Sequence, residues 1–223
     1  MNTLLVFARE PRPGRVKTRL AAGIGAAAAC QLYRAFLQDL AGHLGTLAET
    51  RVIWWVDGHA SKLREAVGAA WQSQWQVHGQ PEGHLGIRLE TAFRSAFAAS
   101  PHAVAVIGSD CPHLNPELLS DLFVPLAGGA DAVLLPARDG GYAGLALAAP
   151  CKEAFQNVPW STDRVAEVTL ANLRQSGREA VTLLPVFDVD TAADLQVLGK
   201  LLATHPELAP HTAALLAALE ASQ

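Results

Sequence analysis

The sequence contains few cysteines and no long apolar run. Cys30, Cys111 and Cys151 lie far apart and form no C-x-x-C pair, so neither a disulfide framework nor a structural zinc site is favoured. No apolar run approaches the roughly 20 residues that a membrane-spanning helix needs. The apolar run within residues 1–8 is too short for a signal peptide. We therefore expect reduced thiols, no membrane span and a cytoplasmic location.

The chain also lacks an excess of positive charge. It carries 17 Lys and Arg against 21 Asp and Glu, which gives a net charge of −4. A general nucleic-acid-binding protein usually has a basic surface, so we expect no nucleic-acid partner. No repeat, low-complexity tract or linker divides the 223 residues, and this length suits one α/β domain with its own core. We predict a single domain over residues 1–223, with closing helices over about 191–221.

Short apolar runs alternate with helical segments along the chain. The expected strands lie at 3–8, 51–56, 74–78, 103–107, 131–136, 144–148 and 179–187. The expected helices lie at about 26–47, 61–70, 85–99, 115–126, 161–175, 191–204 and 206–221. This alternation predicts a three-layer α/β/α sandwich around a mostly parallel sheet. The strand at 74–78 alternates polar and apolar residues, which is typical of an edge strand.

A single acidic residue follows one of the most apolar expected strands. The run at 103–107 is too short for a core helix, and its β-branched residues favour an extended chain. It stops at Gly108, and Asp110 lies just beyond. Ligands of open α/β sheets bind outside the carboxyl ends of the strands. Asp110 is therefore a predicted site residue.

A basic loop follows the first expected strand. Five of the 17 basic residues of the chain lie in it, namely Arg9, Arg12, Arg15, Lys17 and Arg19. Cations this dense repel one another unless an anion neutralises them, and the following helix N-terminus adds partial positive charge. We predict that this loop, including Gly14, binds phosphate groups, although a solvated basic turn would have the same composition. It is not a P-loop, because the G-x-x-x-x-G-K-[ST] spacing is absent.

A second group of carboxylates follows the last expected strand. Asp188 and Asp190 share a face in an extended chain, and Asp194 lies one helical turn beyond, after the expected cap Thr191. A basic loop, one strand-end Asp and an Asp pair together suit a metal-assisted nucleotide site. Mg²⁺ and Mn²⁺ prefer carboxylate and phosphate oxygens as ligands.

Two further segments are candidates for substrate binding. Paired glycines at 139–142 allow close backbone approaches, although an ordinary hairpin explains their spacing equally well. The segment 160–162 offers a Trp that could instead be core, followed by Ser and Thr as expected helix caps. The predicted substrate residues are Asp139, Gly140, Gly141, Tyr142, Trp160, Ser161 and Thr162. The Ala- and Leu-rich C-terminal segment suits packing or a homo-oligomer surface.

Five ordered motifs resemble those of the DUF2064 family. They are Phe7-Ala-Arg-Glu-Pro-Arg-Pro-Gly-Arg-Val-Lys-Thr-Arg-Leu20, Gly108-Ser-Asp-Cys-Pro112, Asp139-Gly-Gly-Tyr142, Trp160-Ser-Thr162 and Asp188-Val-Asp-Thr-Ala-Ala-Asp-Leu195. The resemblance covers residues 3 to about 200, and its first motif is the most specific. That family is described as glycosyltransferases with the GT-A, nucleotide-diphospho-sugar transferase fold. The wider superfamily includes sugar-phosphate, molybdopterin and phospholactate nucleotidyltransferases.

The resemblance implies a metal-dependent transferase acting on a nucleotide and a small-molecule acceptor. Glycosyl transfer from a nucleotide-sugar is the leading interpretation. Nucleotidyl transfer from a nucleoside triphosphate to a phosphorylated small molecule, with release of pyrophosphate, is the alternative, because the basic loop suits a triphosphate. A non-catalytic nucleotide-binding protein is a third interpretation.

The resemblance also assigns roles to the candidate residues. Asp110 and Asp190, together with Asp188, are expected to hold Mg²⁺ or Mn²⁺. The expected catalytic residues are Lys17 and Asp110, and the expected phosphate or nucleotide ligands are Arg9, Gly14, Arg15, Lys17, Arg19 and Gln80. Two segments depart from the family pattern: His84 and Ile87 replace acidic residues, and Ala143-Gly144 leaves more room where the family commonly has a bulky aromatic or aliphatic pair. We expect these departures to change the acceptor pocket.

Overall fold

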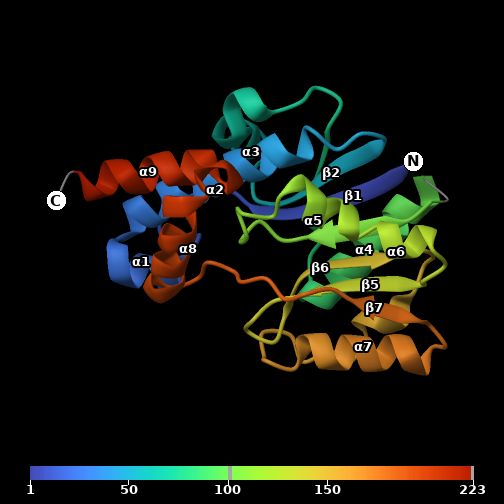
Figure 1. Ribbon diagram of the computed structural model, residues 1–223. Helices are drawn as coiled ribbons and strands as arrows, with labels where there is room; N and C mark the ends of the chain where they lie inside the picture. The colour runs from blue at the N-terminus through green and yellow to red at the C-terminus, as the bar shows by residue number, and fades with distance from the viewer. Residues whose placement is uncertain (100–101, 222–223) are drawn as a thin grey trace.

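The computed structural model describes residues 1–99 and 102–221. A seven-stranded sheet with the order β3-β2-β1-β4-β6-β5-β7 carries helices on both faces (Figure 1). The strands are β1 (Asn2–Arg9), β2 (Thr50–Asp57), β3 (Gln76–Gly79), β4 (Val104–Ile107), β5 (Ala132–Pro136), β6 (Tyr142–Leu147) and β7 (Ala180–Thr182). The α-helices are α1 (Thr18–Ile24), α2 (Ala26–Leu44), α3 (Ala60–Val67), α4 (Leu85–Ala99), α5 (Pro116–Asp121), α6 (Val124–Ala127), α7 (Val165–Gln175), α8 (Ala192–Thr204) and α9 (Pro210–Glu220). Short 3₁₀ segments are η1 (Gly68–Ala70), η2 (Lys152–Phe155) and η3 (Pro206–Leu208).

The sheet is parallel except at one strand. β1 pairs in parallel with β2 and β4, β2 with β3, and β5 with β7, whereas β6 is antiparallel to both β4 and β5. The register of β1 on β2 ends with Arg9 beside Asp57, so both residues lie at the carboxyl edge. The expected three-layer α/β/α sandwich is confirmed, and β3 is an edge strand as predicted.

The central strands are buried on both faces, which explains their continuous apolar sequences. On one face, Leu4 and Val6 belong to the core that α2, α3 and α5 cover. On the other face, Leu5 belongs to a second core beneath α4 and α7. Successive residues of β1 thus supply opposite cores, as the two-residue period of a strand requires.

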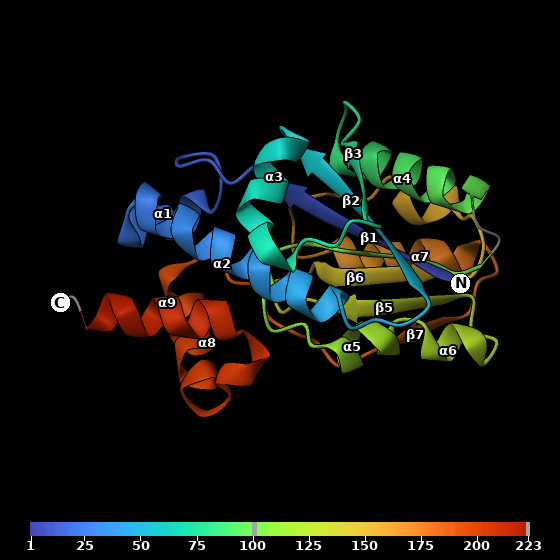
Figure 2. The same cartoon turned by 90° about the horizontal axis from the view of Figure 1, so that it is seen from above.

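The C-terminal helices form a layer beyond the carboxyl ends of the strands. In Figure 2, α8 and α9 lie with α1 on that side of the molecule. The buried carboxylate of Asp39, on α2, accepts hydrogen bonds from His211 N at 2.7 Å and from Thr212 N at 2.9 Å. Asp39 therefore supplies the first turn of α9 with the acceptors that its free N–H groups need. This cap fastens the C-terminal layer to α2, which begins beside the candidate site.

Several predicted boundaries are wrong. The predicted helix start at Ala26 is confirmed for α2, but helix α1, which begins inside the basic loop, was not predicted; Gly25 at φ 86° separates the two helices. The expected strand 179–187 keeps only β7, since its second half is irregular around Pro185, which has no N–H to donate. Helix 115–126 is split into α5 and α6, whereas its cap Asn115 is confirmed. The capping box of Thr191 on α8 is also confirmed.

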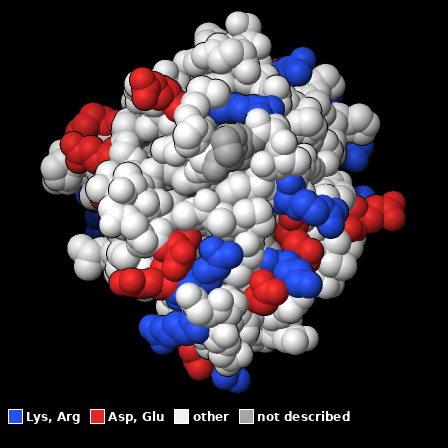
Figure 3. Space-filling view, turned by 90° about the vertical axis from the view of Figure 1, so that its right-hand side faces the viewer, with Lys and Arg blue, Asp and Glu red and all other residues white. Residues whose placement is uncertain are grey.

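The surface opposite the carboxyl edge is mixed in charge. Figure 3 shows that face, where basic and acidic side chains are interspersed. This agrees with the net charge of −4. Among the helices that the structure describes, none has both the length and the apolar character needed to cross a bilayer.

Candidate functional site

A cavity of about 620 Å³ lies at the carboxyl edge of the sheet. Its walls come from the C-terminal ends of β1, β2 and β4, from the start of the antiparallel strand β6, from the basic loop and from the start of α4. The predicted residues that line it are Arg9, Lys17, Arg19, Gln80, Asp110, Tyr142, Ser161 and Asp190. The predicted residues that do not line it are Gly14, Arg15, Asp139, Gly140, Gly141, Trp160, Thr162 and Asp188. The fold thus gathers residues from five separate motifs into one cavity.

Lys17 lies at the centre of the charged part of this cavity. Its side chain is only 3% exposed, and its Nζ contacts Asp110 Oδ1 and lies 2.9 Å from Asp190 Oδ1. Burial alone would lower the pKa of Lys17, but the charges of both carboxylates and their hydrogen bonds outweigh burial and raise it. Lys17 therefore remains an ammonium ion that bridges two acids from distant parts of the chain.

The backbone at Lys17 is held in an unusual conformation. Lys17 adopts φ 48° and ψ 45°, the left-handed region, immediately before α1. Such a conformation costs about 1 to 2 kcal/mol for a residue with a side chain. It persists where surrounding contacts fix it, and such positions cluster at functional sites. The two ion pairs of Lys17 are the contacts that fix it here.

Asp110 follows the end of β4, and Asp190 lies in the irregular segment just before α8; a backbone hydrogen bond joins the two segments. Val189 N donates to Asp110 O at 3.1 Å, which holds the late segment against the end of β4. The Asp110 side chain is 50% exposed and that of Asp190 is 37% exposed, so both carboxylates also face the cavity. Arg19 Nη1 lies 3.9 Å from Asp190 Oδ2. This pair of acids can offer oxygen atoms to a ligand or a cation.

A buried hydrogen-bond chain supports this centre. Tyr33 on α2 accepts from Arg9 N at 2.9 Å and shares a 2.7 Å hydrogen bond with Ser109 Oγ. Burial, with the nearby charge of Asp110, raises the pKa of Tyr33 to about 12, so its hydroxyl keeps its proton. These hydrogen bonds join the ends of β1 and β4 to α2. Sequence reasoning assigned no role to either residue: Ser109 lies within the quoted motif at 108–112, whereas no local pattern marks Tyr33.

Two of the candidate carboxylates fit a divalent cation. Within residues 1–99 and 102–221, no group of three or more His, Cys, Asp or Glu side chains is arranged to hold a metal ion. Burial and the neighbouring charge of Asp139 raise the pKa of Asp188 to about 6, and Asp188 does not line the cavity. Asp194 caps α8 by accepting from Thr191 N at 2.7 Å. Two acids remain, and one or two carboxylates plus substrate phosphates are the usual Mg²⁺ set. Asp110 and Asp190 therefore fit this group once Lys17 moves aside.

The two predicted substrate segments pack against each other. A Cβ on Gly140, at φ 89°, would overlap the carbonyl oxygen of Asp163, so only glycine permits this approach. The loop at 139–142 also connects a β-hairpin, since β5 and β6 are antiparallel neighbours. Ser161 adopts φ 67° and α7 begins at Val165, so the expected Ser161 or Thr162 cap is wrong.

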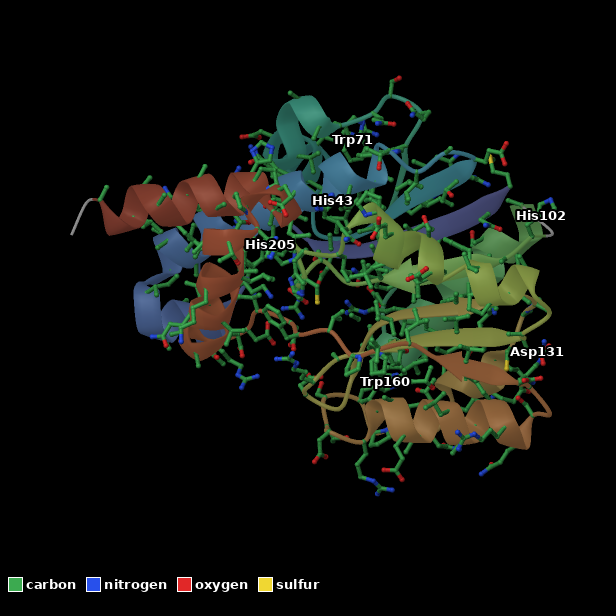
Figure 4. All side chains as sticks on the ribbon, in the orientation of Figure 1. His43, Trp71, His102, Asp131, Trp160 and His205 are labelled. Carbon is green, nitrogen blue, oxygen red and sulfur yellow. The ribbon has the colours of Figure 1, made fainter. Side chains whose placement is uncertain are left out.

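Trp160 lies near the start of α7 (Figure 4). Its Nε1 is so close to Gly86 on α4 that a Cβ there would lie 2.7 Å away. Trp160 also meets the ring of Tyr142 edge to face, with centroids 6.4 Å apart. Trp160 therefore packs the wall of the cavity, and Tyr142 and Ser161 line it.

The two residues that replace acids of the family pattern, and the cysteine beside Asp110, also lie near the site. His84 is exposed and lines the cavity, while Ile87 covers Gly83 and does not line it. Burial and the charge of Asp110 raise the pKa of the Cys111 thiol well above its usual range, which disfavours thiolate chemistry. All three cysteines are free and buried, as expected.

The chain matches the family DUF2064, described as an uncharacterized protein conserved in bacteria, over residues 40–162. No curated protein matches the sequence. A crystal structure from Desulfovibrio desulfuricans G20, assigned to the nucleotide-diphospho-sugar transferases, is 30% identical with a TM-score of 0.90, over 99% of this chain and 95% of that one.

Two more distant structures share the fold. The 4-diphosphocytidyl-2C-methyl-D-erythritol synthase of Anaerococcus prevotii DSM 20548 has a TM-score of 0.58 at 10% identity, over 91% of this chain and 96% of that one. A cytidylyltransferase from Leptospira borgpetersenii serovar Hardjo-bovis has a TM-score of 0.56 at 12% identity, over 99% and 94%. The chain belongs to the DUF2064 family and has the fold of the nucleotide-diphospho-sugar transferases.

Proposed function

We propose that the protein is a metal-assisted nucleotidyltransferase. It transfers a nucleotidyl group from a nucleoside triphosphate to a small acceptor and releases pyrophosphate. The observation that carries this proposal is the Lys17 ammonium held between Asp110 and Asp190, beside a loop of arginines. Such a centre can exchange its internal ion pairs for phosphate oxygens and a cation.

The charge of the basic loop favours a polyphosphate. None of Arg9, Arg12 and Arg15 forms a salt bridge with a carboxylate in the described part of the chain. Of these three, only Arg9 lines the cavity, so its charge is available to a ligand there together with those of Lys17 and Arg19, while Arg12 and Arg15 add positive charge nearby. A triphosphate carries more negative charge than the diphosphate of a nucleotide-sugar, so it neutralises this loop more completely.

The proposed reaction is an in-line displacement. An anionic oxygen of the acceptor's phosphate group bonds to the α-phosphorus, and the bond from that phosphorus to the bridging oxygen breaks, so that pyrophosphate leaves with the electron pair. Lys17 and Arg19 bind the departing phosphates and offset their growing charge. Asp110 and Asp190 would hold Mg²⁺ or Mn²⁺, which supplies Lewis-acid polarisation of the phosphate oxygens when bound.

Glycosyl transfer is the second candidate. One observation favours it, namely the assignment of the Desulfovibrio desulfuricans relative to the nucleotide-diphospho-sugar transferases. In that reaction the sugar carbon changes partners and a nucleoside diphosphate leaves. Both reactions would use Asp110, Asp190 and Lys17, so the two reactions are distinguished by their products.

The test combines ligand binding with product analysis. The purified protein is mixed with Mn²⁺ and each nucleoside triphosphate, and separately with UDP- and GDP-sugars. We expect triphosphates to raise the melting temperature more than nucleotide-sugars, because a ligand that binds only the native state stabilises it. We also expect slow pyrophosphate release. Tighter binding of nucleotide-sugars with release of nucleoside diphosphate would instead establish glycosyl transfer.

Matched variants test the centre itself. Asp110→Asn and Asp190→Asn should abolish the Mn²⁺-dependent part of the shift, whereas Asp188→Asn should retain it. The melting temperature of each variant without ligand shows whether it folds. If all three variants keep the metal-dependent shift, the assignment of the two metal-holding carboxylates is wrong.

A further inference from the structure

The cavity has a second polar wall at the ends of β2 and β3, built around the side chain of Gln80. The Nε2 of Gln80 donates to Ala8 O and to Trp55 O, both at 3.1 Å. These two bonds use both amide hydrogens, so the Oε1 of Gln80 faces the other way. The reverse orientation would set Oε1 against two carbonyl oxygens. The amide of Gln80 is therefore fixed by the backbone of β1 and β2.

Gln80 in turn fixes Arg88, in the first turn of α4. Arg88 Nη1 donates to Gln80 Oε1 at 3.1 Å, and Arg88 Nε donates to Gly83 O at 2.8 Å. Arg88 Nη2 has no partner in the part of the chain that the structure describes. The guanidinium is thus held on two sides, and three of its five N–H hydrogens, two on Nη2 and one on Nη1, remain for a ligand.

Asp57 lies beside this guanidinium. Its Oδ2 is 3.6 Å from Arg88 Nη1, beyond a hydrogen bond, and its side chain is 52% exposed. Asp57 ends β2 next to Arg9, the first residue of the basic loop. The pair therefore presents fixed donors next to free acceptors, in the parallel half of the sheet and alongside the proposed phosphate site.

We propose that Arg88 and Asp57 read the base of the nucleotide, and that Gln80 is a positioning residue for Arg88. This inference rests on the proposed function, because it assumes that the basic loop holds the phosphates. The arrangement matches a base whose edge has two adjacent acceptors followed by donors. Guanine fits best.

The ranking of bases follows from their edges. Guanine offers N7 and O6 to the guanidinium, and its N1–H and N2–H₂ groups to the carboxylate. Cytosine offers two acceptors but only one donor group. Adenine places its amino group between acceptors, and uracil places its N–H between two carbonyls, so each sets a donor against Arg88 or an acceptor against Asp57. We expect the affinity order GTP, then CTP, then ATP and UTP.

The experiment measures dissociation constants of the four triphosphates with Mg²⁺ by calorimetry, with inorganic tripolyphosphate as a probe of the phosphate site alone. Arg88→Met should raise the dissociation constants of GTP and CTP about tenfold or more, the range expected for the loss of a bidentate base contact. Asp57→Asn should weaken the binding of GTP more than that of CTP. Neither variant should change tripolyphosphate binding.

Gln80→Met tests the positioning role. It should reduce the ratio of GTP to ATP affinity, whereas a merely structural defect would weaken all nucleotides and tripolyphosphate together. Arg94→Met is the matched control, since Arg94 is exposed on the same helix and does not line the cavity. It should leave every constant unchanged.

Three results would overturn the inference. One is equal or tighter binding of ATP or UTP in the wild type, and another is an unchanged base ratio in Arg88→Met and Asp57→Asn. The third is tripolyphosphate binding without nucleotide binding. If the triphosphates do not bind but GDP-sugars bind more tightly than UDP-sugars, the proposed nucleotidyl transfer is wrong, whereas the assignment of Arg88 and Asp57 to base recognition is supported. If no nucleotide or tripolyphosphate binds, both fail.

Discussion

Replacing Lys17 with Met should strengthen the binding of Mn²⁺ in the absence of nucleotide. In the ligand-free protein, the Lys17 ammonium takes one oxygen from each of Asp110 and Asp190. A cation that uses the same two carboxylates must first displace this ammonium. Met keeps a similar length of apolar chain and removes the charge, so both acids become free.

The magnitude follows from the two ion pairs. A hydrogen bond between charged groups contributes about 1.5 to 3 kcal/mol. Because the acids are 50% and 37% exposed, solvent screens them, and we take about 1 kcal/mol for each pair. Removing both ion pairs should make the binding free energy of Mn²⁺ more favourable by about 2 kcal/mol, which corresponds to a roughly 30-fold lower dissociation constant.

The assay is the electron paramagnetic resonance signal of free Mn²⁺, titrated with protein. Lys62→Met is the control, because Lys62 pairs with the exposed Glu65 away from the cavity. The same Lys17→Met variant should bind tripolyphosphate more weakly, since it lacks a phosphate ligand. Mn²⁺ binding equal to or weaker than that of the wild type would refute the competition between Lys17 and the metal.

Three further substitutions test the support of the site. Tyr33→Phe leaves two buried polar groups without a partner, so the free energy of unfolding in urea should fall by about 1 to 3 kcal/mol. Burial, with the charge of Arg138, lowers the pKa of the buried His113 to about 4 from 6.5, so the wild type should lose stability as the pH falls from 6.5 to 4. His113→Phe keeps the stack on Phe187 and should remove up to about 3 kcal/mol of this pH dependence, measured by urea unfolding at several pH values. Gly140→Ala should lower the free energy of unfolding by about 2 kcal/mol or more, measured in the same way.

Each of these has its own control. Tyr142→Phe removes a buried hydroxyl that has no partner in the described residues, so it should not destabilise the protein as Tyr33→Phe does. His102→Gln, at an exposed position, should keep the wild-type pH dependence. Gly177→Ala has a similar positive φ, 75°, with open space around the added carbon. If it costs as much as Gly140→Ala, backbone strain explains the loss and contact with the neighbouring loop does not.

Much of the site could be predicted from the sequence because parallel strands end at the same edge. Lys17, Asp110 and Asp190 each follow an apolar run, so their convergence required only the topology. Their mutual arrangement could not be predicted, since Lys17 and Asp190 are 173 residues apart. The same holds for Tyr33, which lies inside a helix with nothing local to distinguish it from other core residues. Side-chain contacts over such separations depend on the packed structure.

Some predicted helix and strand boundaries were wrong for a different reason. At Ser161 a positive φ replaces the extended backbone that an N-cap residue usually has, so a favourable cap sequence did not make a cap. At 183–187 the residues favour a strand, but only an isolated bridge at Val186 pairs with β5 beyond β7. At Ser161 the surrounding structure overrides a local preference, whereas at 183–187 the strand is interrupted around Pro185, which has no N–H to donate.

The motifs that suggested substrate binding divide into two physical kinds. Gly140 is required because another backbone occupies the space of a side chain, and Gly86 is required because Trp160 packs on it. These residues shape the loops without lining the cavity. Tyr142 and Ser161, next to them in sequence, do line it. Substitutions of the first kind should therefore change stability and every ligand together, whereas substitution of Ser161 should change affinity for the acceptor alone.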